Sequence, residues 1–153
     1  MGLMLLAIRF SKKDFERLTG KKTNAKTKTK NKYNNKKIFI GGKRYDSEKE
    51  FLRHRELIVL ERAGAISQLR FHDKQDLLIL IEKPLLKYEP DFCYIENGKL
   101  IIEDLKGYQT KEFKVKKKII ASKIFKGEIN AIFRLTKYED GKFKIIEEYN
   151  KAP

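Results

Sequence analysis

Asp91, Asp104 and Lys106 have the residue types and the spacing for chemistry on a phosphodiester. Between the two aspartates lies Asn97-Gly98, the strongest short signal for a two-residue β-hairpin turn. In the register that this turn sets, Asp91 lies directly opposite Asp104, with Cβ atoms about 4.5–5.5 Å apart. Two like charges repel at that distance, and burial increases the cost. We therefore expect the pair to share either a proton or a divalent cation.

Lys106 adds a positive charge to the same place. Side chains alternate between the two faces of a strand, so Asp104 and Lys106 share one face while Glu103 points to the other. The same register puts Glu89 opposite Lys106 as an acidic neighbour. Mg²⁺ binds one or two carboxylates together with phosphate oxygens, and it can activate water. A lysine beside it would position that water or stabilise the transition state, whereas a structural salt-bridge cluster is the alternative for the same charges.

The elements that must position these residues form one α/β unit, expected over residues 38–153 after a separate segment at residues 1–37. Ser47 is a candidate helix N-cap with Glu50 as its capping-box partner, and Gly64 ends the helical pattern. A short helix is expected at residues 12–19 and a longer one at residues 111–125. The expected strands are 38–40, 66–71, 77–81, 88–95, 99–105, 129–135 and 143–146.

The positive charge is concentrated in the first part of the chain. The net charge is +15, and residues 1–44 hold 14 Lys and Arg against 2 Asp and Glu. Residues 20–32 contain no apolar side chain larger than alanine, so they cannot offset the entropy of ordering, and we expect a flexible arm. We expect the arm to neutralise phosphates, with a solubilising tail as the alternative. The lysines concerned are Lys21, Lys22, Lys26, Lys28, Lys30 and Lys32.

The helix expected at residues 111–125 is also basic. Lys114, Lys117 and Lys118 share about one helical face, where like charges repel each other unless a partner is present. Together with Lys111, we expect them to contact phosphates, which positions a nucleic acid without reading its sequence. An ordinary solvated helix face is the alternative.

The remaining composition limits the class of protein. A single cysteine, Cys93, excludes a disulfide scaffold and suits a reducing compartment, so we expect a cytoplasmic protein. No run approaches the roughly 18 apolar residues of a membrane span, and we expect no membrane partner. The basic excess instead favours a polyanionic partner such as nucleic acid.

Pro90-Asp91 followed by Asp104-Leu105-Lys106 resembles the PD-(D/E)XK motif of restriction-endonuclease-like nucleases. Over about residues 31–135 the chain is also similar to a group of small phage-borne proteins of that superfamily. The further stretches that carry this likeness are Asn31-Lys32-Tyr33-Asn34, Tyr45-Asp46-Ser47-Glu48-Lys49-Glu50, Glu61-Arg62-Ala63-Gly64, Gly107, Thr110 and the Phe113-to-Lys118 run. The resemblance implies a restriction-endonuclease-like core, with a mixed central sheet of about four to five strands flanked by helices.

The same resemblance implies a DNA endonuclease dependent on Mg²⁺ or Mn²⁺. Members often bring an acidic metal ligand from the first core helix, so Glu50 would join Asp91 and Asp104, with Glu48 as its rival. His72 corresponds to a position where related proteins often carry glutamine, and we leave it out of the catalytic set. Small phage members include dimeric junction-resolving enzymes, which implies structure-selective cutting of branched DNA by a homodimer. The alternative is a non-catalytic nucleic-acid-binding protein that retains the fold.

Removing residues 20–37 should weaken DNA binding without slowing the chemistry at saturation. The dependence of log K on log salt should become flatter by about 0.9 for every phosphate that the shortened protein no longer neutralises. Binding measured across a salt series, together with single-turnover cleavage at saturating protein, tests this expectation. Equal salt slopes with and without residues 20–37 would refute a role of the arm in phosphate binding.

Overall fold

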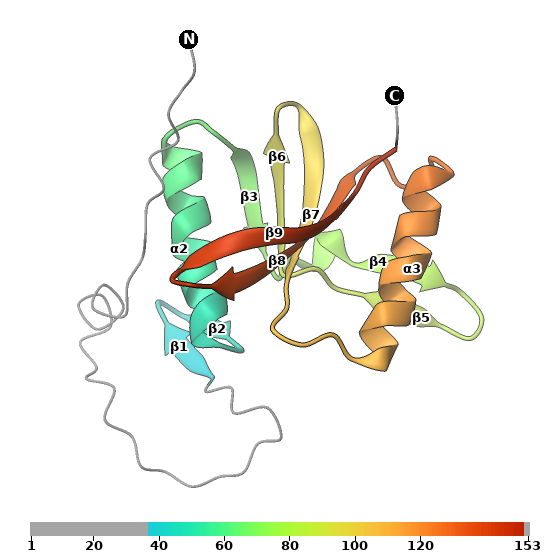
Figure 1. Ribbon diagram of the computed structural model, residues 1–153, viewed down its shortest axis with the longest axis horizontal. Helices are drawn as coiled ribbons and strands as arrows, with labels where there is room; N and C mark the ends of the chain where they lie inside the picture. Colours follow the sequence, from blue (N-terminus) through green and yellow to red (C-terminus); the bar gives the residue numbers. More distant parts are fainter. Residues whose placement is uncertain (1–36, 152–153) are drawn as a thin grey trace, which may run out of the picture.

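A mixed five-stranded β-sheet lies at the centre of the computed structural model, which describes residues 37–151 (Figure 1). The strand order is β3-β6-β7-β8-β9; β7 and β8 run parallel, and the other neighbours run antiparallel. The strands are β3 (Ser67–Phe71), β6 (Phe92–Glu96), β7 (Lys99–Leu105), β8 (Ile132–Glu139) and β9 (Lys142–Tyr149). The expected α/β class with a mixed sheet and flanking helices is confirmed.

β6 and β7 form the hairpin that Asn97-Gly98 predicts. Both turn residues have a positive φ, 50° and 74°, which matches the twist of the strands they join. Phe92 pairs with Glu103, as in the predicted register. The ladder ends at this pair, so Asp91 lies one residue beyond the strand.

Two helices flank the sheet on opposite sides (Figure 1). α2 (Glu48–Arg62) begins after Ser47, whose hydroxyl accepts the N–H of Glu50 at 3.1 Å. The Glu50 carboxylate accepts the N–H of Asp46 at 2.6 Å. In the expected capping box it would accept the N–H of Ser47, which is one residue later. α3 (Lys111–Phe125) has the expected bounds and forms the crossover between the parallel strands β7 and β8.

Successive residues of the central strands face the two helices in turn. The apolar cluster on the α2 side consists of Leu57, Ile66, Phe92, Tyr94 and Ile101. The cluster on the α3 side includes Ile102, Ile120, Ile124, Phe133 and Leu135. Complete burial of one such side chain stabilises the fold by about 1.5–3 kcal/mol, so these two layers hold both helices against the sheet.

Two small hairpins lie outside the central sheet and account for most differences from the sequence prediction. Their strands are β1 (Ile38–Ile40), β2 (Lys43–Tyr45), β4 (Leu78–Ile81) and β5 (Leu86–Tyr88). A 3-10 helix, η1 (Lys74–Asp76), precedes β4. The strand expected at residues 88–95 is divided between β5 and β6, because Pro90 has no N–H to offer a ladder. β8 begins and ends later than expected, and β9 is longer at both ends.

Residues 1–36 and 152–153 lie outside the described part of the chain. The short helix expected at residues 12–19 and the basic arm with its six lysines fall in this region. Among the helices of residues 37–151, none is long and apolar enough to cross a membrane.

A buried ion pair joins α2 to the middle of the sheet. Arg53 donates through Nε to Oε1 of Glu103 at 2.6 Å and through Nη2 to Oε2 at 2.9 Å. Glu103 is fully buried and also accepts the hydroxyls of Tyr94 and Thr136. Burial alone would raise the pKa of Glu103, but the charge of Arg53 and these hydrogen bonds outweigh it and lower the pKa. The carboxylate is therefore ionised, with both of its oxygens bonded.

Arg53→Ala should lower the free energy of unfolding by about 3–5 kcal/mol, because it leaves the Glu103 carboxylate buried without its cation. Lys123→Ala is a suitable control, since Lys123 pairs with Glu128 at 2.8 Å on the surface and should contribute little. Urea unfolding at neutral pH measures both. A similar destabilisation of the two variants would show that the buried pair does not anchor α2.

Candidate metal centre

Glu50, Asp91, Asp104 and Lys106 line one cleft of about 940 Å³. Glu50 comes from the first turn of α2, and Asp91 immediately precedes β6. Asp104 lies near the end of β7, and Lys106 directly follows this strand. The fold therefore brings the four residues of the predicted catalytic set together. Glu48, the rival of Glu50, does not line this cleft.

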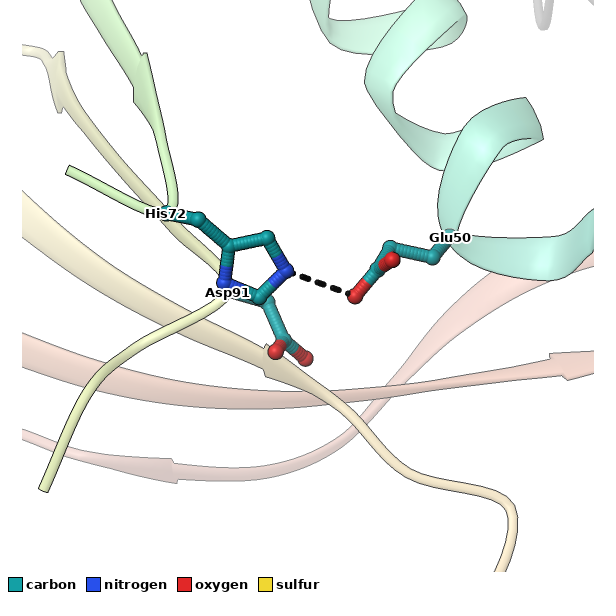
Figure 2. A group of neighbouring side chains, drawn as sticks. All are labelled: Glu50, His72 and Asp91. Carbon is teal, nitrogen blue, oxygen red and sulfur yellow. Dashed lines mark hydrogen bonds and ion pairs between the residues drawn. The ribbon is translucent and has the colours of Figure 1, made fainter. Parts of the chain in front are cut away.

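His72 completes a group of three side chains that could hold a metal ion (Figure 2). One ligand atom from each of Glu50, His72 and Asp91 lies within 4.8 Å of the others. Nε2 of His72 and Oε1 of Glu50 form a hydrogen bond of 3.0 Å. This hydrogen bond raises the pKa of His72 against the opposite effect of burial. The imidazole thus holds the Glu50 carboxylate at the centre.

His72 is the site residue that sequence reasoning missed. It follows β3, and its φ of 46° lies in the left-handed region that a non-glycine residue seldom adopts. Its backbone N–H donates to the carbonyl of Asp91 at 3.1 Å, which ties the end of β3 to the start of β6. In the sequence, the signals were a histidine at the end of an expected strand and its correspondence to a position where related proteins often carry glutamine.

Asp91 and Asp104 are adjacent buried carboxyls. Burial, the charge of Asp104 and a hydrogen bond between the two groups raise the pKa of Asp91 well above its usual range. Asp91 Oδ2 also accepts the N–H of Leu105 at 2.8 Å. The raised pKa of Asp91 favours a proton shared between the two carboxyls when no cation is bound, which is one of the two arrangements that the sequence predicted.

Asp104 is held from two sides. Lys106 Nζ donates to its Oδ1 at 2.7 Å, and the Tyr88 hydroxyl donates to its Oδ2 at 2.9 Å. Burial and the charge of Asp104 raise the pKa of Tyr88, so the phenol keeps its proton. Burial would lower the pKa of Lys106, but the charges of Asp91 and Asp104 outweigh it and raise the pKa. Lys106 is therefore a fixed ammonium, 5.0 Å above the ring of Phe113.

The two glutamates that flank the motif also have definite places. Glu103 faces α2 and its ion pair with Arg53, on the side of the sheet away from Asp104, as alternation predicts. The carboxylate of Glu89 lies 3.9 Å from Nδ1 of His72. The hairpin ladder does not reach Glu89, so the predicted cross-strand pairing of Glu89 with Lys106 does not form.

The lysines of α3 divide into two groups, and Lys117 corrects the sequence prediction. Lys117 is buried, and its ammonium donates to Glu147 at 2.6 Å and to Gln109 at 2.7 Å. Burial would raise the pKa of Glu147, but hydrogen bonds from Lys117 and its neighbours lower it to about 2. Lys117 thus joins α3 to β9 and cannot offer its charge to a phosphate. Lys111, Lys114 and Lys118 are exposed, and their contact with nucleic acid stays a prediction.

The chain is similar to a known protein family. Residues 30–140 match the family described as "Protein of unknown function (DUF1064)". The chain matches none of the curated proteins and none of the solved structures.

Asp91→Asn should make the metal-free protein more stable, and the gain should grow with pH. A raised carboxyl pKa means that the folded state binds the proton more tightly than the unfolded state does. Parent stability then falls as pH rises above about 4, by up to about 1.4 kcal/mol per pH unit. The neutral asparagine does not incur this cost.

Urea unfolding in EDTA at pH 5 and pH 8 measures the difference between Asp91→Asn and the parent. Asp140→Asn, at an exposed position, is the control and should show no such pH dependence. A gain for Asp91→Asn that is equal at the two pH values would contradict the shared proton.

Proposed function

The chain belongs to the DUF1064 family, and we propose that it is a divalent-metal-dependent nuclease with a restriction-endonuclease-like core, acting on DNA in the cytoplasm. The order of elements supports this proposal. α2 precedes the antiparallel strands β3, β6 and β7, and α3 then leads to β8, parallel to β7. This is the order that the resemblance of Pro90-Asp91 and Asp104-Leu105-Lys106 to the nuclease motif implies.

One observation carries the proposal: two adjoining carboxyls are buried beside an ammonium at the end of an open cleft. Strongly shifted pKa values in a cleft are typical of functional sites. A protein that only bound nucleic acid would need mainly positive charge here. This cleft is instead lined by six carboxylates and four lysines, which would repel a phosphodiester unless cations were bound. The catalytic function is therefore favoured over the non-catalytic alternative.

The donor atoms of the site fit a divalent cation. Glu50, Asp91 and Asp104 would hold Mg²⁺ or Mn²⁺ through hard carboxylate oxygens. His72 would add a nitrogen ligand, which transition metals accept more readily than Mg²⁺ does. When bound, the metal supplies an activated water and neutralises charge on the phosphodiester.

Lys106 would act mainly in the transition state. Its ammonium is fixed by Asp104 and points into the cleft at the end of β7. The attacking water and the pentavalent phosphorus group gain negative charge during hydrolysis, and a preorganised ammonium stabilises developing charge better than resting charge. The exposed lysines of α3 and the arm would supply phosphate contacts outside the cleft. A homodimer would present two such sites to the two strands of a branched substrate.

The parent protein should cut branched DNA in Mg²⁺ or Mn²⁺ but not in EDTA. Asp104→Asn should greatly weaken divalent-ion binding measured by calorimetry, because it removes a charged ligand. Lys106→Ala should bind DNA almost as well as the parent and cut about 10²–10³ times more slowly. Lys123→Ala, at the far end of α3, is the control for the removal of one lysine.

Paired gel-shift and single-turnover measurements on one branched substrate test these expectations. Metal affinity in Asp104→Asn equal to that of the parent would remove the metal assignment. A Lys106→Ala variant that cuts at the parental rate when saturated would reduce that lysine to a structural partner of Asp104.

A further inference from the structure

An aromatic side chain is largely exposed to solvent beside the metal centre. Tyr108 is two residues after Lys106, in the loop between β7 and α3, and it lines the same cleft. Its side chain is 68% exposed, although a large aromatic side chain gains from burial. Gly107 and Thr110 of the same loop also line the cleft, so this loop forms part of its wall. An exposed aromatic in a loop next to the reacting groups has the position of a ligand contact.

Two lysines on other elements line the same cleft. Lys49 lies in the first turn of α2 and adjoins Glu50, whereas Lys87 belongs to β5. Both are exposed, and neither forms an ion pair with any residue of the part of the chain that the structure describes. By contrast, Lys116 of α3 is paired with Glu112 at 2.7 Å. Lys49 and Lys87 therefore bring exposed ammonium groups to the cleft on elements separate from that of Tyr108.

This combination indicates how a nucleic-acid strand lies in the cleft. An aromatic ring with flanking cations is the usual binding surface for single strands, because bases stack on the ring and phosphates meet the cations. In a paired duplex both faces of each base are already stacked on neighbours, so only an unpaired nucleotide can present a face to Tyr108. Such a contact does not depend on the sequence.

We propose that Tyr108 stacks on an unpaired base next to the reacting phosphodiester, while Lys49 and Lys87 bind the phosphates on either side. The substrate class is therefore a strand with at least one unpaired nucleotide at the cleft. This inference rests on the proposed nuclease function only for the position of the base next to a phosphodiester that is cleaved, and the binding contact itself can be tested without cleavage.

The test compares the full-length protein on three labelled oligonucleotides of equal length by fluorescence anisotropy. One duplex carries three unpaired nucleotides, the second carries abasic sites at those positions, and the third is fully paired. Ca²⁺ replaces Mg²⁺ as a hard cation for the carboxylates, and gels check that the strands stay intact. The basic arm meets all three substrates equally, so its contribution cancels in the comparison.

Tyr108→Ala should weaken binding to the unpaired substrate by about 5- to 100-fold and leave the other two unchanged. The parent should bind the abasic substrate more weakly than the unpaired substrate by the same factor. The abasic substrate lacks the base of the stacked pair, just as Tyr108→Ala lacks the ring. Tyr108→Phe should retain the parental preference. Phe125→Ala, which removes an aromatic of α3 that is 58% exposed and outside the cleft, should have no effect.

An equal weakening of Tyr108→Ala on all three substrates, or no weakening on any, would overturn the stacking contact. Cleavage is scored separately in Mg²⁺ and Mn²⁺. A parent that never cuts but shows the Tyr108-dependent preference would refute the nuclease function and support the stacking contact. A parent that cuts, with no preference that depends on Tyr108, would refute the contact alone.

Discussion

The forced contact between Asp91 and Asp104 is the constraint on which the site depends. The hairpin ladder ends one residue before these two positions, which leaves the carboxyls adjacent, and burial makes two negative charges there unfavourable without a proton or a cation. Three neighbouring groups stabilise this negative charge by hydrogen bonds: Lys106 and Tyr88 donate to Asp104, and the N–H of Leu105 donates to Asp91. In the proposed function, a divalent ion would replace the proton at this pair.

The opposite face of β7 supplies the rigidity that the site needs. Glu103 is the neighbour of Asp104 in the strand, and Arg53 lies about one helical turn after Glu50 in α2. The buried Arg53–Glu103 pair therefore sets the distance between the helix and the strand that carry the acidic groups. One strand thus presents the fully paired carboxylate of Glu103 to the core and the carboxyl of Asp104 to the cleft, because successive side chains point to opposite faces.

Whether a lysine of this fold can contact a ligand depends on whether it already has an ion-pair partner. Lys117 is held by its ion pair with Glu147, which joins α3 to β9, whereas Lys49 and Lys87 are exposed and line the cleft. The proposed nuclease function and the proposed stacking contact depend on the two ends of the segment 106–108. Lys106 at its start faces the acidic centre, and Tyr108 two residues later is exposed at the cleft wall.

Local signals in the sequence determined much of this protein. Asn97-Gly98 decided the register that sets Asp91 beside Asp104, and β7 and α3 have the predicted bounds, because turns, caps and periodicity act over a few residues. Only the tertiary structure decided that His72 meets Glu50, that Lys117 is buried against Glu147 and that Tyr108 lines the cleft. Each of these depends on how elements distant in the chain pack together. Packing between distant elements is set by the whole core, and no short-range pattern records it.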